Sequence, residues 1–89
     1  MKHALLITAT IYQAIDHLRD TKWIIGAHRQ IVSPDGEKVS RVFRADDMAG
    51  YQRGTRVYVL PKAFDLIGDP QREMMEALIE RRGYERVDL

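Results

Sequence analysis

An unbroken apolar run near the middle of the chain, Val57–Leu60, constrains the fold more than any other stretch. Its residues are mostly β-branched or aromatic and do not alternate with polar ones, a pattern typical of a strand that helices cover on both faces. Gly54 and Pro61 bound the run, and Pro61 cannot continue a central ladder because it lacks an N–H. The run therefore predicts a central strand over residues 56–60.

A second apolar run, Ala4–Ala9, has the same character and predicts a second buried strand over residues 4–9. Thr10 then stands as a helix N-cap, and Gln13 completes a Thr-x-x-Gln capping box. Apolar residues follow at helical spacing: Ile11, Ala14, Ile15 and Leu18. A strand that leads directly into an amphipathic helix is the first half of a βαβ unit, so we expect the strands 4–9 and 56–60 to lie side by side and parallel.

The segment between these runs predicts a hairpin over residues 29–44. Trp23–Val32 is apolar enough for an extended segment, weakened at Gly26. Ser33–Gly36 reads Ser-Pro-Asp-Gly, which is a strong β-turn sequence. The outgoing strand should place Phe43 in the core.

The second half of the chain predicts two further helices and a last strand. Asp46 is expected to cap a short helix that Met48 anchors, and Asp69 to cap the last helix ahead of Pro70. Gly83 is a natural residue to end that helix. The buried stripe of the last helix should be Met74, Met75, Leu78 and Ile79, and residues 84–89 are long enough for a strand.

The element order is therefore β-α-β-β-α-β-α-β, which indicates an α/β fold. We expect one small domain over residues 1–89, built on a mixed sheet of four to five strands. Its centre should be the parallel strands 4–9 and 56–60, with the 29–44 hairpin beside them.

Composition narrows the classes of function. Of the 89 residues 45% are apolar and 30% charged, which is an ordinary balance for a folded domain. The absence of cysteine excludes disulfides, thiol nucleophiles and cysteine-based zinc sites. The longest apolar run is far shorter than the roughly 20 residues that cross a bilayer. We expect a soluble, cytoplasmic protein with no membrane partner.

No catalytic, metal or cofactor motif is apparent in the sequence. The three histidines, His3, His17 and His28, lack metal-ligand spacing, with His17 expected on the surface and His28 in a strand. Neither Ser33 nor Ser40 lies in a Gly-x-Ser-x-Gly elbow. Asp46 and Asp47 are more typical of a helix start than of an acid–base pair. We therefore predict a protein without chemistry, metal or cofactor of its own.

One place could still hold a small anion. In open α/β sheets, ligands bind beyond the carboxyl ends of the parallel strands. Thr8, Thr10 and Lys62 should meet at that end, near a helix N-terminus that favours phosphate. The turn after the first strand contains no glycine, however, so Thr10 is expected to serve mainly as a cap.

Charge offers a second alternative, a nucleic-acid-binding hairpin. Residues 22–62 hold eight Lys or Arg against four Asp or Glu, although the whole chain carries only +1. A two-stranded ribbon fits a major groove and basic side chains follow phosphates. The candidates are Arg29, Lys38, Arg41, Arg44, Arg53 and Arg56.

Binding of a protein partner is the leading interpretation. A small sheet must leave edge strands, which invite pairing with another chain and would also permit homo-oligomers. Aromatic residues and arginine dominate the binding energy of interfaces. The candidates of these types are Trp23, Tyr51, Arg53, Arg56 and Tyr84.

A resemblance adds a biological setting to this interpretation. The segment Phe43–Pro61 reads Phe-Arg-Ala-Asp-Asp-Met-Ala-Gly-Tyr-Gln-Arg-Gly-Thr-Arg-Val-Tyr-Val-Leu-Pro. It resembles a strand, short helix and strand phrase of small accessory proteins of tailed bacteriophages. The resemblance covers about a fifth of the chain and carries no functional residue. It implies an accessory phage protein that binds and modulates a host protein.

Overall fold

The structure is a computed structural model that describes residues 2–89. Over these residues it contains a six-stranded mixed sheet in the order β2-β3-β4-β1-β5-β6. The strands are β1 (His3–Ile7), β2 (Ile24–Ile25), β3 (Ile31–Val32), β4 (Lys38–Val42), β5 (Arg56–Val59) and β6 (Glu85–Asp88). β4, β1, β5 and β6 run parallel, whereas β3 and β2 are antiparallel additions at one margin.

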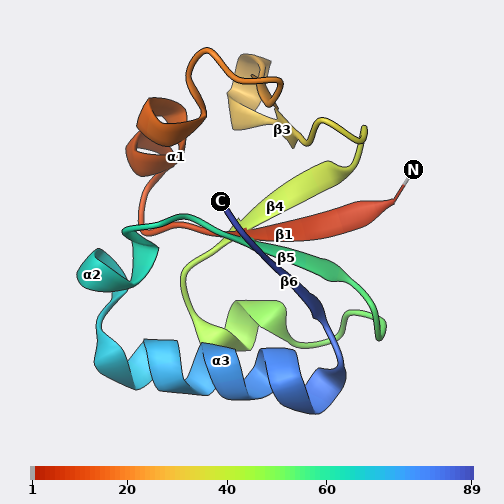
Figure 1. Ribbon diagram of the computed structural model, residues 1–89, viewed down its shortest axis with the longest axis vertical. Helices are drawn as coiled ribbons and strands as arrows, with labels where there is room; N and C mark the ends of the chain where they lie inside the picture. The colour runs from red at the N-terminus through yellow and green to blue at the C-terminus, as the bar shows by residue number, and fades with distance from the viewer. Residues whose placement is uncertain (1) are drawn as a thin grey trace.

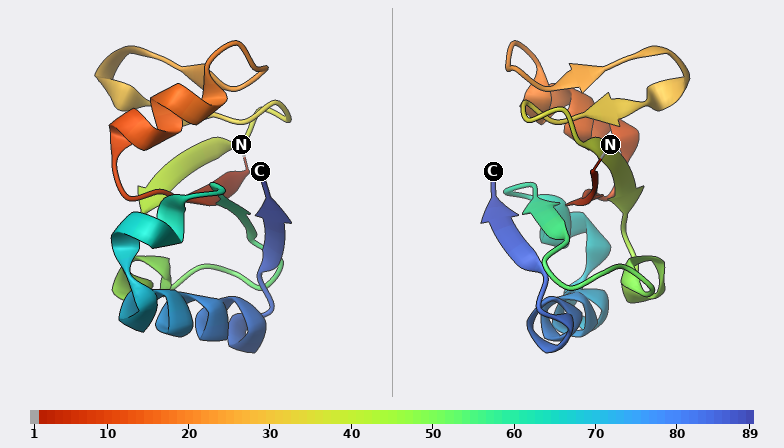
Figure 2. Two further views of the ribbon diagram at one scale, coloured as in Figure 1. Left: turned by 60° about the vertical axis from the view of Figure 1, so that its left-hand side comes forward. Right: turned by 90° about the vertical axis from the view of Figure 1, so that its right-hand side faces the viewer.

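Helices cover both faces of the sheet. They are α1 (Ile11–Leu18), α2 (Ala63–Ile67) and α3 (Asp69–Arg82), with two 3₁₀ turns, η1 (Ala27–Arg29) and η2 (Ala45–Met48). Figure 1 shows α1 above the sheet and α3 with η2 below it, and Figure 2 shows the same three layers from the side. This arrangement follows from right-handed crossovers, because the chain moves from β1 to β4 in one direction and from β5 to β6 in the other.

The two apolar runs form the centre of the sheet, as predicted. β1 and β5 are parallel neighbours in the register Leu5↔Val57. Leu5, Leu6 and Val57 are fully buried, because α1 covers one face of the sheet and α3 the other. The strands are shorter than expected, however, and the sheet has six strands instead of four to five.

The additional strand arises in the segment that was expected to be one extended stretch. Between β2 and β3 the chain turns sharply through η1, where His28 and Arg29 have φ near +60°. His28 therefore lies in a turn, not in a strand. The predicted turn after β3 is present, with the Gly36 N–H donating to the Ser33 carbonyl at 2.9 Å and φ of +83° at Gly36.

The predicted ends of the helices agree with the structure better than the predicted capping residues do. Thr10 caps α1, and α3 ends at Gly83 in the left-handed conformation. Asp46 and Asp69 instead lie within the first turns of η2 and α3, and neither helix has a side-chain cap. Gly68, at φ +97°, turns the chain so tightly after α2 that α3 begins directly at Asp69.

Two residues expected in the core are exposed. Phe43 is 49% exposed because β4 ends at Val42 and the chain then turns toward η2, which breaks the alternation of the strand. Met74 is 51% exposed. α3 presents Met75 and Ile79 to the sheet, which leaves Met74 on the flank of the helix.

Candidate functional site

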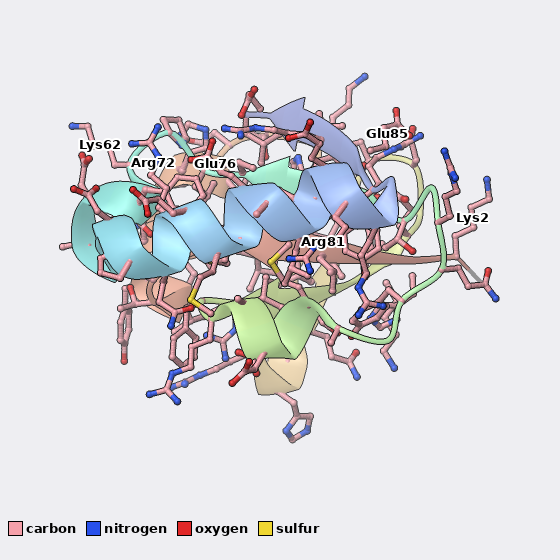
Figure 3. The ribbon with its side chains drawn as sticks, turned by 90° about the horizontal axis from the view of Figure 1, so that it is seen from below. Lys2, Lys62, Arg72, Glu76, Arg81 and Glu85 are labelled. Atoms are coloured by element: carbon pink, nitrogen blue, oxygen red, sulfur yellow. The ribbon has the colours of Figure 1, made fainter. Side chains whose placement is uncertain are left out.

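The carboxyl end of the parallel strands is where an α/β sheet of this topology binds ligands. β1 and β5 are neighbours whose following helices cover opposite faces, so a crevice between them is expected beyond residues 8 and 60. Lys62 and Arg72 lie at this end in Figure 3, whereas Lys2 and Glu85 lie at the opposite, amino end. The two ends differ in their chemistry.

At the carboxyl end the Gln13 side chain lies between the turn after β1 and the turn after β5, beside a groove that Leu60, Pro61 and Lys62 also line. Its Oε1 accepts from the Ala9 N–H at 2.9 Å, and its Nε2 donates to the Lys62 carbonyl at 2.9 Å. The predicted capping box is thus present, but the amide reaches Ala9 instead of the N–H of Thr10. Gln13 ties the turn after β1 to the turn after β5.

The residues of the predicted anion site take part in the hydrogen bonds that join these two turns. Thr8 is 1% exposed and its hydroxyl donates to the Thr10 carbonyl at 2.8 Å. The Thr10 hydroxyl accepts from the Gln13 N–H at 3.1 Å. The structure therefore brings Thr8, Thr10 and the backbone of Lys62 together, and internal hydrogen bonds occupy both hydroxyls.

Large apolar side chains are exposed on the segments that follow the parallel strands. They are Tyr12 (67% exposed), Phe43 (49%), Leu66 (68%) and Met74 (51%), and we call them the carboxyl-end patch. Each follows a parallel strand or borders a segment that does: Tyr12 is in the first turn of α1, and Leu66 is in α2 after β5. Met74 also lines a groove between η2 and α3, together with Ala45. Side chains of this size are costly to leave in water, so the patch suits an apolar partner.

A shallow apolar groove and two arginine–aromatic pairs accompany the patch. The groove has a volume of about 440 Å³ and runs between η2 and α3; its small or apolar lining includes Ala45, Ala49, Met74, Ala77 and Leu78. The guanidinium of Arg44 lies 5.8 Å from the Phe43 ring centre, and that of Arg72 lies 5.2 Å from the Phe64 ring centre. Aromatic and arginine side chains are the types that dominate interface energies.

The amino end of the sheet holds a polar network in place of exposed apolar groups. Glu37 is 6% exposed, and its Oε1 accepts from the Tyr58 hydroxyl at 2.5 Å and the Ser33 hydroxyl at 2.9 Å. Arg56 adds a contact to Glu37 at 3.4 Å and a shorter one to Asp35 at 2.7 Å. The network joins the β3–β4 turn to β5 across the end of β1.

Burial and charge within this network shift two pKa values. Burial raises the pKa of Tyr58 above its usual value of about 10, and its hydrogen bond to Glu37 adds to the rise. The hydrogen bonds of Arg56 to Tyr58 and Asp35 raise the pKa of its guanidinium above its usual range. Both groups therefore keep their protons, and the network consists of a neutral phenol, a guanidinium and two acidic side chains.

The aromatic residues proposed for protein binding have different environments. Tyr84 is 6% exposed and donates its hydroxyl to the Met48 carbonyl at 2.7 Å, so it belongs to the core and its selection as a surface residue is wrong. Trp23 packs edge-on against Tyr58, with ring centres 4.7 Å apart. Tyr51 stacks on His3 at 5.7 Å. Trp23 and Tyr51 are half-buried, and both lie away from the carboxyl-end patch.

The basic residues proposed for nucleic acid are spread over the molecule. Lys38 begins β4 and Arg44 lies two residues beyond its end, so the strand itself, about 13 Å long at ~3.3 Å per residue, stands between them. Arg56 is paired with acidic side chains, and Arg53 lies over Gly83 near the amino end. β4 also pairs with β1 over its whole length, so the hairpin is part of the sheet and is not a free ribbon. Arg29 is in η1 and Arg41 is exposed on β4.

Several residues of the two ends are not among the site residues that the sequence predicts. Glu37 and Tyr58 meet although 21 positions separate them, and no local pattern announces such a pair. Leu66 is apolar, but its exposure depends on how α2 sits against α3. Gln13 is different, because the capping-box spacing had already indicated a hydrogen-bonding role.

Comparisons of this chain with protein-family models, with characterised proteins and with solved structures found no match. Within residues 2–89 the structure contains no cluster of three or more His, Cys, Asp or Glu side chains arranged to bind a metal ion. The helices described over that range are all too short or too polar to span a membrane.

Proposed function

We propose that this chain is a small protein-binding domain without chemistry of its own, and that its partner covers the carboxyl-end patch. One observation carries the proposal: Tyr12, Phe43 and Leu66 project into solvent around the end of the sheet at which domains of this topology bind ligands. Burial of apolar surface against a protein partner would contribute about 25 cal/mol of favourable free energy per Å² there.

A partner with its own apolar surface fits this end better than a small anion does. The Gln13 side chain hydrogen-bonds to both neighbouring turns, and so engages the Ala9 N–H that a phosphate at this end could use. An anion would have to displace both hydrogen bonds. It could accept from the Ala9 N–H, but its ionised oxygens could not donate to the Lys62 carbonyl. A protein surface that packs over Gln13 leaves both hydrogen bonds in place.

Nucleic acid is the alternative partner, and the distribution of charge favours it less. Phosphate contacts need several basic side chains along one track. Lys38 begins β4 and Arg44 lies beyond its other end, and Arg56 is paired with Asp35. We therefore favour a protein partner for this domain.

The class of protein that we propose as the partner rests on the resemblance of residues 43–61 to accessory proteins of tailed phages. On this basis we propose that the domain is an accessory protein made by a phage or prophage and that its target is a host protein. The segment contributes Phe43 to the carboxyl-end patch and η2 to the groove beside it.

The test is affinity capture from bacterial lysate followed by binding to the purified target. We expect the wild-type chain to retain one host protein, and a Phe43→Ser/Leu66→Ser variant to bind that protein at least about tenfold more weakly, because it lacks two apolar anchors. Ile24→Ser is the matched control, since Ile24 is 61% exposed but lies in β2, at the margin of the sheet. It should bind as the wild type does.

Two results would contradict this proposal. In one, the patch variant and the control bind the target equally well. In the other, the chain is retained on DNA or RNA in a salt-sensitive manner and an Arg41→Ala/Arg44→Ala variant is not, which would establish nucleic acid as the partner.

A further inference from the structure

Strand β6 forms a free margin of the sheet. Within residues 2–89 it pairs only with β5, and Figure 2 shows no other element along its outer side. The Glu85 N–H donates to the Thr55 carbonyl at 2.9 Å, and the Leu89 N–H donates to the Val59 carbonyl at 3.0 Å. Because the backbone groups of a strand alternate in direction, those of Arg86 and Asp88 point outward. β6 thus offers two residues to a further strand.

The side chains of these two residues lie on the same face and form one ion pair. Arg86 Nε is 3.0 Å from Asp88 Oδ1, and a second nitrogen of Arg86 is 3.3 Å from Glu76 of α3. Val87, between them, faces the other side of the sheet and is half-buried. The outward-pointing backbone groups therefore belong to one cation and one anion, two positions apart.

We propose that two copies of this chain pair through β6, antiparallel and centred on Val87. This register places Arg86 opposite Asp88 of the second copy, and Asp88 opposite Arg86 of the second copy. Both are hydrogen-bonded pairs, since the backbone groups of Arg86 and Asp88 already point outward, and each pair exchanges two N–H···O bonds. The ion pair within each strand extends into a four-membered alternation of charges, and the two Val87 side chains meet at the close, non-hydrogen-bonded position.

The neighbouring two-fold registers are unfavourable. A pairing centred on Arg86 would set two guanidinium groups opposite each other, and one centred on Asp88 would set two carboxylates opposite each other. A register shifted by one residue would pair Arg86 with Val87. These side chains lie on opposite faces of the sheet, so that register is excluded. Charged edges commonly prevent pairing with foreign strands, and here the same charges select one partner, a second copy of this chain.

The test compares oligomeric state by sedimentation for the wild type and two charge variants. The wild type is expected to reach twice the monomer mass as its concentration rises. Arg86→Asp and Asp88→Arg should each weaken self-association by at least about tenfold, because each sets like charges opposite each other at both pairs. An equimolar mixture of the two variants should regain the dimer, since one then carries two acidic and the other two basic side chains at these positions.

A third variant acts on the backbone alone. Asp88→Pro removes an outward N–H that the dimer needs and leaves the bonds between β5 and β6 intact, so it should also be monomeric. Circular dichroism of every variant checks that the fold is kept. A wild type that stays monomeric up to millimolar concentration would overturn the proposal, as would a dimer that all three variants retain. Neither result bears on the carboxyl-end patch, which lies on other elements.

Discussion

The two ends of the parallel sheet use opposite chemistry. At the amino end, Glu37 is buried and its carboxylate accepts from Tyr58, Ser33 and Arg56, so charged and polar groups bind one another. At the carboxyl end, apolar side chains such as Leu66 and Phe43 face solvent. The amino end thus buries a carboxylate within a hydrogen-bonded network, whereas the carboxyl end leaves large apolar side chains exposed, which under our proposal a partner covers.

This contrast has an energetic consequence. A buried hydrogen-bonded network is costly to disturb, because each orphaned polar group loses both its partner and its hydration. An exposed apolar side chain contributes little to the folded state, because it is in water before and after folding. Substitutions in the amino-end network should therefore change stability, whereas substitutions of the exposed apolar side chains in the carboxyl-end patch should change binding.

The largest effect is expected at Glu37. Replacing Glu37 by Ala leaves the buried hydroxyls of Tyr58 and Ser33 without their acceptor, and should lower the free energy of unfolding by about 2–4 kcal/mol. Urea denaturation measures this change. Asp35→Ala is the matched control, since Asp35 is largely exposed beside the same arginine and should cost less than about 1 kcal/mol. Equal losses in both variants would show that the network is not a buried one.

A smaller loss of stability is expected at Gln13, which joins the turn after β1 to the turn after β5. Gln13→Ala removes the acceptor of the Ala9 N–H and the donor to the Lys62 carbonyl, and should lower the free energy of unfolding by about 1–2 kcal/mol. Gln13→Glu keeps the acceptor and should lose only part of this. The same denaturation experiment distinguishes the two variants. If Gln13→Ala were as stable as the wild type, the hydrogen bonds of Gln13 to the two turns would not contribute to stability.

The pH dependence of the free energy of unfolding tests the amino-end network through the titration of one group, Tyr58. Burial raises the pKa of Tyr58 in the folded state above its unfolded value of about 10, so the folded protein holds that proton to higher pH. The contribution to stability is complete below about pH 10 and is lost as the pH rises through the folded pKa. We expect Tyr58→Phe to unfold with a flatter pH profile above pH 10. An unchanged profile would indicate that Tyr58 is in contact with water.

The smallest change in stability is expected at the carboxyl-end patch. Phe43→Ser and Leu66→Ser should each change the free energy of unfolding by less than about 1 kcal/mol, because both side chains are about half exposed or more. Thermal unfolding would measure this directly. A loss as large as that of Glu37→Ala would mean that these side chains support the fold, and the contrast between the two ends would fail.

The fold was largely predictable because its main signals are local. The run Val57–Leu60, the capping box of Thr10 and Gln13, and Gly83 each specify a structure within a few residues. What failed depended on distant parts of the chain: the burial of Tyr84 on Met48, and the exposure of Phe43 where β4 ends. The pairing of Glu37 with Tyr58 depends on the order of the strands, which no local pattern encodes.

The most direct test of the account is hydrogen–deuterium exchange of the chain with and without its captured protein partner. The account predicts that the partner slows exchange in residues 9–13, 43–49 and 61–67, which surround the carboxyl-end patch, and leaves residues 33–37 and 51–56 at the amino end unchanged. Slower exchange at the amino end, with none at the carboxyl end, would contradict it.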